Sequence, residues 1–253
     1  MQIRSIILYN HVGEVRELTF ELGAVNIITG RSLTGKSAIG DIIDYCLGRS
    51  TFAIAEGVIR DTVAWYGVIF DFGNGTEVLV AKPAPEHNAA SQSAAYLQVG
   101  NSLKPPPWSE LNPNTNDQGV IVELSARLGI TPNLHVTKPG ETREQLEATI
   151  RHTVYYLFQV QGLVASKDLL FYRQQEQFMP QAIKDTLPYF LGATNPAQVA
   201  IEHELRLARR RLKIAQRNLE EAESVTADQL VRARGLVAEA QQAGILAAGT
   251  VGT

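Results

Sequence analysis

The sequence predicts an α/β fold: a strand–loop–helix core with an antiparallel β subdomain, leading into an α-helical coiled-coil arm. Three observations support this prediction. A short apolar run, residues 24–29, precedes a glycine-bounded loop and then apolar residues at helical spacing. Two strand-like runs flank a Gly-Asn-Gly turn at 73–75, which is a hairpin pattern. From Ile201 onward, apolar residues recur at alternating steps of four and three, which is a heptad pattern.

The composition favours a globular protein and excludes several classes. The chain has 253 residues, of which 45% are hydrophobic and 19% charged, so wholesale disorder is not expected. The net charge of −3 gives no general basic footprint for nucleic acid. A single cysteine, Cys46, excludes an internal disulfide framework and fits a reducing compartment. The apolar run at the N-terminus is too short for a signal peptide or a membrane span, so we expect a cytoplasmic protein with no membrane partner.

The elements can be justified in chain order from local patterns. The run 3–9 is rich in β-branched residues, 15–22 alternates apolar and polar side chains, and 24–29 is a short apolar strand that ends at Gly30. Apolar residues at helical spacing then predict a helix over about 35–47, which Gly48 would end.

Later elements follow from turns and periodicity. Residues 63–72 and 76–82 form the predicted hairpin, and 83–116 are rich in Pro, Ser and Asn and predict loops. Three helices and one less regular stretch are then expected; the helices lie at 117–128, 141–157 and 173–191, and the stretch lies at 161–172.

The heptad pattern predicts the arm. Its apolar seam consists of Ile201, Leu205, Ala208, Leu212, Ala215, Leu219 and Ala222, with Arg, Lys and Glu on the faces between them. Thr226 and Gln229 break the seam, which can resume at Leu230 after a shift. We therefore expect a first domain over 1–198 and the start of a truncated coiled-coil arm over 199–253.

The loop from Gly30 to Ser37 matches the phosphate-binding pattern G-x-x-x-x-G-K-[ST]. Glycines let such a loop turn tightly, so that backbone N–H groups converge on phosphate oxygens. Lys36 would reach the β- and γ-phosphates, and the Ser37 hydroxyl would bind Mg²⁺. The following helix would point the positive end of its dipole at the anion. The alternative is a glycine-rich turn between a strand and a helix, without a ligand.

The stretch IRSIILYNHVGEVRELTFELGAVNIITGRSLTGKSAIGDIIDYCLG resembles the N-terminal lobe of ABC-type head ATPases of the SMC-like class, which includes SMC, RecN, RecF and SbcC. The resemblance implies binding of ATP and Mg²⁺. It places nucleotide contacts on Gly30, Arg31, Ser32, Leu33, Thr34, Gly35, Lys36, Ser37 and Ala38, and further ones on Arg4, Asn10 and Arg16. For the last three, ion-paired surface arginines and a turn-capping asparagine are equally good interpretations. Ser32 departs from the Asn that this class usually has there.

A second stretch, YYLFQVQGLVASKDLLFYRQQEQF, resembles the Q-loop of these heads. The resemblance implies that Gln161, with Gln159 as the alternative, completes the shell of Mg²⁺ and the attacking water. The alternative interpretation is a pair of solvated glutamines at a helix end. Lys82 lies where the class often has a basic residue at a strand end; an edge-strand lysine that discourages aggregation is an equally good interpretation.

The resemblance also defines what the sequence lacks. In the class, a second lobe supplies the Ser-Gly motif and an Asp-Glu pair that holds Mg²⁺ and activates water. No run of four apolar residues followed by Asp-Glu occurs after Leu191, and Glu220-Glu221 lies in the heptad region. We therefore expect the N-terminal half of a longer polypeptide, nearly inactive alone, whose partners are its own C-terminal lobe and a second head across ATP. DNA backbone contacts, for which Arg209, Arg210 and Arg211 are candidates, and accessory subunits are further implied partners.

The motifs GRSLTGKS, DIIDYCLG, LFQVQG and LPYFLGA look closest to a little-characterised prokaryotic group of SMC-like ATPases that includes phage-defence members. Residues 83–150 match poorly and are interpreted as a family-specific insertion. Two alternatives remain: a self-contained P-loop NTPase or kinase, with Asp71 as its only candidate Mg²⁺ partner, and a nucleotide-gated scaffold. ATP is preferred over GTP because no Asn-Lys-x-Asp step is present, and the five histidines show no metal-ligand spacing.

Overall fold

The structure is a computed structural model, and it describes residues 1–31, 34–86, 89–131, 146–193 and 196–243. By its internal contacts the chain divides into two units, Met1–Pro196 and Ala197–Thr253.

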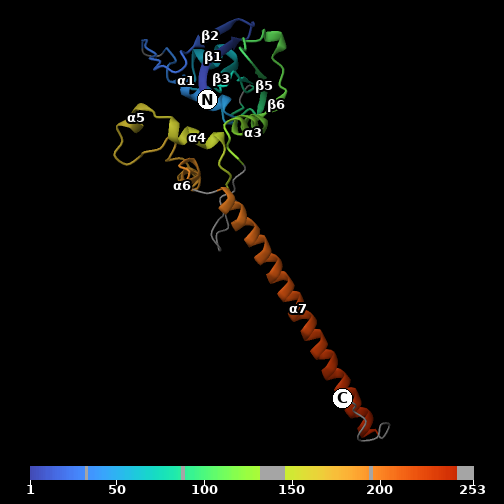
Figure 1. The fold of residues 1–253 in the computed structure, drawn as a ribbon. Helices are drawn as coiled ribbons and strands as arrows, with labels where there is room; N and C mark the ends of the chain where they lie inside the picture. The colour runs from blue at the N-terminus through green and yellow to red at the C-terminus, as the bar shows by residue number, and fades with distance from the viewer. Residues whose placement is uncertain (32–33, 87–88, 132–145, 194–195, 244–253) are drawn as a thin grey trace. The chain divides into compact units, whose positions relative to one another are not determined.

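The first unit contains a six-stranded sheet in the order β2-β1-β3-β4-β5-β6, in which every pair of neighbours is antiparallel (Figure 1). Its strands are β1 (Gln2–Asn10), β2 (Val15–Thr19), β3 (Val63–Asp71), β4 (Glu77–Pro83), β5 (Ala94–Gly100) and β6 (Thr115–Asn116). The helices of this unit are α1 (Ala38–Cys46), α2 (Val58–Thr62), α3 (Asp117–Arg127), α4 (Ile150–Leu157), α5 (Gln161–Val164) and α6 (Met179–Phe190), with a short 3₁₀ turn, η1, at Trp108–Glu110.

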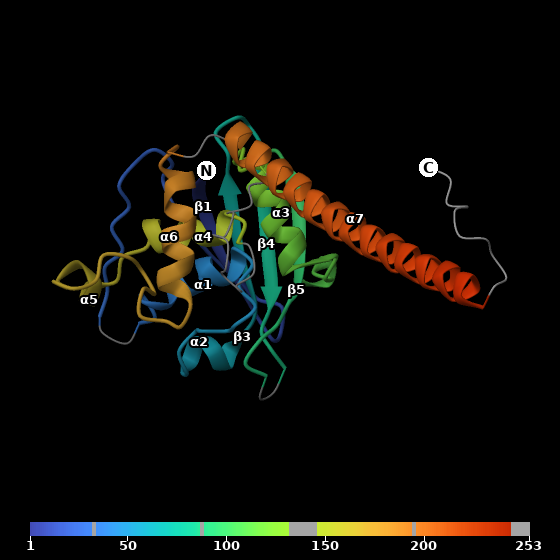
Figure 2. The ribbon, with the colours of Figure 1, turned by 90° about the horizontal axis from the view of Figure 1, so that it is seen from below.

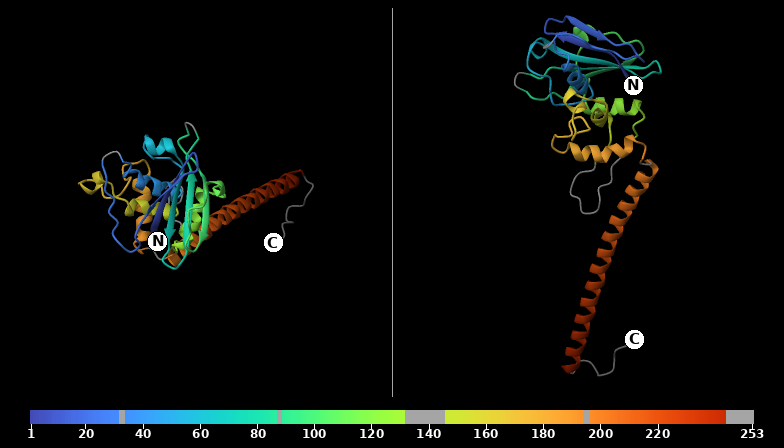
Figure 3. Two further views of the ribbon diagram at one scale, coloured as in Figure 1. Left: turned by 90° about the horizontal axis from the view of Figure 1, so that it is seen from above. Right: turned by 90° about the vertical axis from the view of Figure 1, so that its left-hand side faces the viewer.

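The two faces of the sheet are covered differently. Helices α1, α3, α4 and α6 lie on one face, as Figures 1 and 3 show, and contribute Ile42, Leu124, Val154 and Ile183 to its core. On the other face, the loop after β5 contributes Leu103 and Leu111 to a second, smaller cluster. Because β3 and β4 are covered on both sides, they are apolar almost without interruption instead of alternating.

The predicted hairpin is confirmed. The turn between β3 and β4 uses Gly73 and Gly75 at φ of 76° and 80°, values that residues with a side chain rarely adopt. The carboxylate of Asp71 accepts a hydrogen bond from the Gly73 N–H at 2.7 Å, and Asn74 Oδ1 accepts one from Thr76 N–H at 3.1 Å. The turn residues therefore satisfy their own backbone, and the register of the two strands follows from it.

The predicted strand over 24–29 is wrong, because these residues form neither a strand nor a helix in the structure. Asn26 closes a local loop instead: its Oδ1 accepts from Glu21 N–H, and its Nδ2 donates to Glu21 O, both at 2.9 Å. Such local bonds compete with a strand ladder, and no neighbouring strand pairs with this run. Val25 and Ile27 are 89% and 82% exposed.

Other boundaries also differ from expectation. The region 83–116 was expected to be loops but contains β5 and β6, which continue the sheet beyond β4. The helix predicted over 141–157 begins at Ile150, although residues 132–145 lie outside the described part of the chain. The helix near 173–191 begins at Met179. Strand β2 was expected to be half-buried, but all five residues are exposed at an edge of the sheet.

The second unit is formed by one long helix. Helix α7 (Pro196–Gln242) has 47 residues, and Figure 1 draws it as an uninterrupted coil. Of the expected heptad seam, Ile201, Leu205, Leu212 and Leu219 are exposed. The backbone remains helical through 226–229, where the seam breaks, while the side chains there lie outside the described residues. The pairing of this helix in a coiled coil stays a prediction.

Candidate phosphate-binding loop

The loop from Gly30 to Ser37 folds around the side chain of its own lysine. Lys36 Nζ donates to the carbonyl oxygen of Gly30 at 2.9 Å, to that of Arg31 at 2.5 Å, and lies 3.3 Å from Thr34 Oγ1. Thr34 Oγ1 in turn donates to Arg31 O at 2.8 Å. The ammonium therefore lies at the centre of the loop, directly before the N-terminus of α1. Ser32 and Leu33 lie outside the described residues.

Glycine is required at one position of this loop and leaves room for neighbouring side chains at a second. Gly35 has φ of +81°, and an added Cβ would overlap the Cδ1 atom of Ile59 on α2. A Cβ on Gly30 would come within 3.3 Å of Thr34 Oγ1 and 3.9 Å of Lys36 Nζ, the group that would meet a phosphate. Gly35 is therefore needed for the close approach of the loop to α2, and Gly30 leaves room next to Thr34 and the Lys36 ammonium.

Ser37 and Ala38 form the start of α1. Ser37 is the N-cap residue but makes no side-chain capping hydrogen bond, and it is exposed. Ala38 N–H is already bonded, to Gly35 O at 3.0 Å. The helix N-terminus carries partial positive charge beside the Lys36 ammonium, so this end of α1 is suited to an anion. The Ser37 hydroxyl, which makes no capping hydrogen bond, is of the kind that can bind a Mg²⁺ ion beside a phosphate.

Two of the three outlying candidates, Arg4 and Asn10, make the contacts of the structural alternatives. Arg4 Nε pairs with Glu77 at 2.9 Å, and its guanidinium also donates to Leu103 O. These partners belong to the sheet face opposite α1, the face of the Leu103 cluster. Asn10 Oδ1 accepts from Val12 N–H at 3.1 Å and from Glu14 N–H at 2.8 Å, so it caps the turn after β1.

The structure does not bring every candidate to the loop. Arg16 is exposed on the edge strand β2. Gln161 is the first residue of α5 and Gln159 lies just before it; both side chains are exposed. In Figures 1 and 2, α5 projects away from α1 at one side of the unit. The roles of these residues toward a nucleotide stay predictions.

An apolar cavity lies beside α1. Its volume is about 400 Å³, and Ile39, Ile43 and Leu47 of α1 form one wall. Leu157 and Phe158 at the end of α4, Phe20 and Phe70, and the residues 21–24 with Asn26 complete most of the lining. The unpaired segment therefore contributes Ala24 and Asn26 to the cavity wall.

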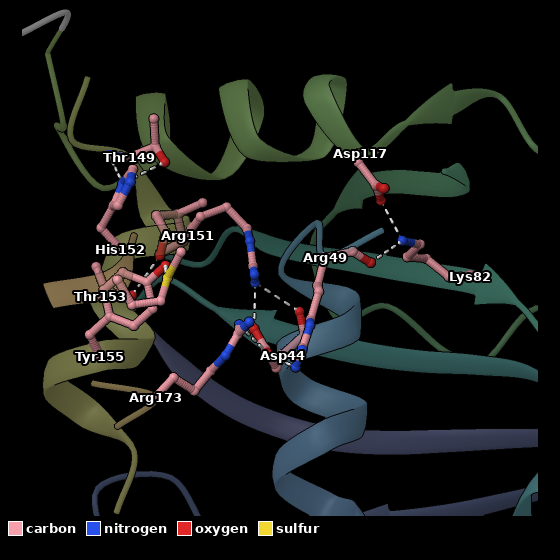
Figure 4. A network of polar contacts seen from close by, with 12 residues as sticks. Asp44, Arg49, Lys82, Asp117, Thr149, Arg151, His152, Thr153, Tyr155 and Arg173 are labelled. Carbon is pink, nitrogen blue, oxygen red and sulfur yellow. Dashed lines mark hydrogen bonds and ion pairs between the residues drawn. The ribbon is translucent and has the colours of Figure 1, made fainter. Parts of the chain in front are cut away.

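The far end of α1 lies in a buried ionic network that the sequence reasoning missed (Figure 4). The fully buried carboxylate of Asp44 pairs with Arg49 at 2.8 Å, with Arg151, and with Arg173 at 3.6 Å. The sequence pattern gives little signal for it, because Asp44 comes one position after Ile43 and is therefore turned about 100° around the helix from it.

Lys82 is neither an edge-strand lysine nor an exposed basic residue. It lies on the interior strand β4, is fully buried, and donates to the Asp117 carboxylate and, at 2.7 Å, to Arg49 O. Its ammonium also lies 4.0 Å from the ring centroid of Tyr45. Burial lowers the pKa of Lys82, while the hydrogen bond with Asp117 acts in the opposite direction.

The candidate Mg²⁺ partner of a self-contained P-loop enzyme, Asp71, makes a structural contact instead. Asp71 caps the β-hairpin turn through Gly73, on an antiparallel strand. In the part of the chain that the structure describes, no three His, Cys, Asp or Glu side chains are grouped so that they could hold a metal ion. Within the same residues, no helix is long and apolar enough to cross a membrane.

Comparisons with known proteins add no identification. No family model, no curated protein and no solved structure matches the chain.

Proposed function

We propose that this chain is the ATP-binding N-terminal half of an SMC-like, ATP-gated, DNA-associated head ATPase that acts in the cytoplasm, in DNA repair or maintenance or in anti-phage defence. The observation that carries the proposal is the loop Gly30–Ser37, in which the Lys36 ammonium occupies the centre of a glycine-bounded turn at the start of α1. Cation, helix N-terminus and Ser37 hydroxyl together suit a Mg²⁺-bound polyphosphate.

Two features support the interpretation as a half-head. The segment 24–29 exposes Val25 and Ile27 although it precedes the phosphate loop, while its Ala24 and Asn26 line an apolar cavity. Exposed apolar residues next to such a cavity are typical of a surface that another part of the protein covers. A C-terminal lobe that pairs with this segment would complete the core and bring the Asp-Glu pair needed to hold Mg²⁺ and activate water.

The same proposal assigns the remaining parts. ATP would be held between this loop and a second head, and its higher affinity for the closed dimer would drive closure. Helix α7 would be the root of the coiled-coil arm, which carries the change to a distal partner or accessory subunit. The exposed Arg209, Arg210 and Arg211 on α7 would offer salt-dependent contacts to DNA phosphates.

The test is Mg-ATP binding and turnover by the purified chain, its Lys36→Ala variant and the control Lys184→Ala. Lys184 is exposed on α6, so its removal subtracts the same charge without touching the loop. We expect binding that Lys36→Ala abolishes and Lys184→Ala retains, with turnover at background for all three. Binding that survives Lys36→Ala would refute the phosphate loop, and robust turnover by the wild-type chain would refute the half-head.

A further measurement separates an ATPase head from a nucleotide-gated scaffold. Sedimentation of the longer polypeptide, which would carry the second lobe with its Ser-Gly motif, should show ATP-dependent dimerisation only with the intact loop, because the nucleotide is the bridge between heads. Assembly that is unaffected by Lys36→Ala would favour the scaffold.

A further inference from the structure

Asp44 collects three guanidinium groups from three separate segments (Figure 4). Arg49 follows the end of α1, Arg151 lies in the first turn of α4, and Arg173 lies between α5 and α6. The Asp44 side chain is fully buried, while the three arginines are 13–16% exposed. A buried carboxylate without such partners would be strongly unfavourable, so these contacts decide how the three segments are held together.

The three contacts differ in strength. Arg49 donates a hydrogen bond to Asp44 Oδ2 at 2.8 Å, and Arg151 donates to Oδ1 and, at 3.1 Å, to the main-chain carbonyl of Asp44. Arg173 lies 3.6 Å from Oδ2, and its Nε donates instead to Glu176 Oε1 at 2.6 Å. Arg173 can therefore leave Asp44 and stay paired, while Asp44 keeps two partners.

Arg173 stands at the base of the loop that carries Gln161. Tyr172 N–H donates to Tyr155 O at 3.1 Å, and the rings of Phe158 and Tyr172 lie 5.8 Å apart. These contacts bring the two ends of the segment 158–172 side by side, so that it forms a closed loop on α4. The next residue, Arg173, has φ of 61°, a region that non-glycine residues occupy only when surrounding contacts hold them there.

Helix α1 connects this base to the phosphate loop. Asp44 lies seven residues after Ser37, which is about 10 Å along one continuous helix. The end of the helix is fixed to the sheet through the hydrogen bond of 2.7 Å from Lys82 Nζ to Arg49 O. A shift of α1 caused by anion binding would act on Asp44, which lies on the same helix before this fixed end and whose weakest contact is the one with Arg173.

We propose that Asp44 is a positioning residue that couples the phosphate loop to the loop 158–172, with Arg173 as its releasable contact. This inference rests on the proposed function, because the ligand that acts on α1 is Mg-ATP. The 158–172 loop would take up one position with the nucleotide bound and another without it, and the Asp44–Arg173 distance would differ between the two. Neither residue would touch the nucleotide.

The test is hydrogen–deuterium exchange of the full chain with and without Mg-ATP, followed by mass spectrometry of peptides covering 30–38 and 158–172. The variants are Arg173→Gln, the control Glu176→Gln, which removes the other partner of Arg173, and the conservative Arg173→Lys. Asp44→Asn is avoided because it leaves three guanidiniums around a neutral group and can unfold the unit. Melting curves of all variants verify folding.

In the wild type, ATP should slow exchange several-fold in peptide 30–38 and change it in 158–172. Arg173→Gln should keep the ATP effect on 30–38 and lose the ATP effect on 158–172. Glu176→Gln should keep both effects, and Arg173→Lys should restore the effect on 158–172 at least in part. If 158–172 still responds to ATP in Arg173→Gln, or never responds in the wild type while 30–38 is protected, the coupling is refuted and the proposed function stands. Absence of protection at 30–38 in the wild type refutes both.

Discussion

Protonation of one partly buried histidine should make the first unit lose stability in mild acid. His152 lies in the first turn of α4 and forms a capping box with Thr149, whose backbone N–H donates to His152 Nδ1 at 3.0 Å (Figure 4). Burial, together with the nearby positive charge of Arg151, lowers the pKa of His152 from 6.5 to about 4. A protonated ring could not accept the capping hydrogen bond, so the geometry and the direction of the shift agree.

The sign and size of the effect follow from linkage. Between pH 4 and 6.5 the unfolded chain binds a proton at His152 that the folded chain does not, so acid favours unfolding. The stabilisation is fully present above pH 6.5 and is lost as the pH falls toward 4. Integrating between pH 7.5 and pH 5 gives a loss of about 2 kcal/mol for this residue.

The matched variant is His152→Gln, because Gln at this helix position can accept the same bond and cannot be protonated. Urea unfolding is followed by tryptophan fluorescence, since both tryptophans, Trp65 and Trp108, lie in the first unit and α7 stays silent. We expect the wild type to lose about 2 kcal/mol more than His152→Gln on going from pH 7.5 to pH 5. Equal losses in the two proteins would refute the reasoning.

Three further outcomes are expected. Gly35→Ala should lower the free energy of unfolding by about 1–2 kcal/mol, because alanine is strained at this positive φ and its Cβ overlaps Ile59, and it should also weaken Mg-ATP binding. Adding Ile59→Ala should recover part of the lost stability, as measured by urea titration of the double variant. Lys82→Met should destabilise by about 3–5 kcal/mol because it leaves the Asp117 carboxylate unpaired, and adding Asp117→Asn should reverse much of this in the same titration. Cys46, whose pKa is raised by burial to about 12, should react with a thiol reagent only at the rate of unfolding, so fast labelling of the native chain would contradict its burial.

The parts that could be predicted from sequence are those set by local patterns. The β3–β4 hairpin follows from Gly73 and Gly75 between two apolar runs, and α1 follows from Ile39, Ile42 and Ile43 at helical spacing. In the loop Gly30–Ser37, Gly35 has the positive φ expected of a tight turn, and the next residue, Lys36, folds back onto Gly30 O; phosphate binding by this loop stays a prediction. In each case, the deciding contacts lie within a few residues of one another.

The parts that could not be predicted depend on distant partners. The run 24–29 has strand composition, but a strand needs a neighbour, and the local bonds of Asn26 prevail where none is present. Strand β5 lies in a Ser- and Asn-rich region whose composition predicts loops, and it is defined by its pairing with β4. The Asp44 network joins residues 107 positions apart in sequence, as in its bond with Arg151, and no periodicity reveals such a pair.

The exposed run from Val25 to Ile28 also has a consequence for how the chain behaves in solution. It contains three β-branched apolar residues and no charge or proline, the composition of segments that stack into intermolecular β-sheets. Because its backbone is not committed to the six-stranded sheet, it can offer hydrogen bonds to a like segment of another molecule without unfolding the core. Self-association of the isolated chain should therefore rise steeply with concentration, and a charged residue at Ile27 should suppress it while the fold is kept.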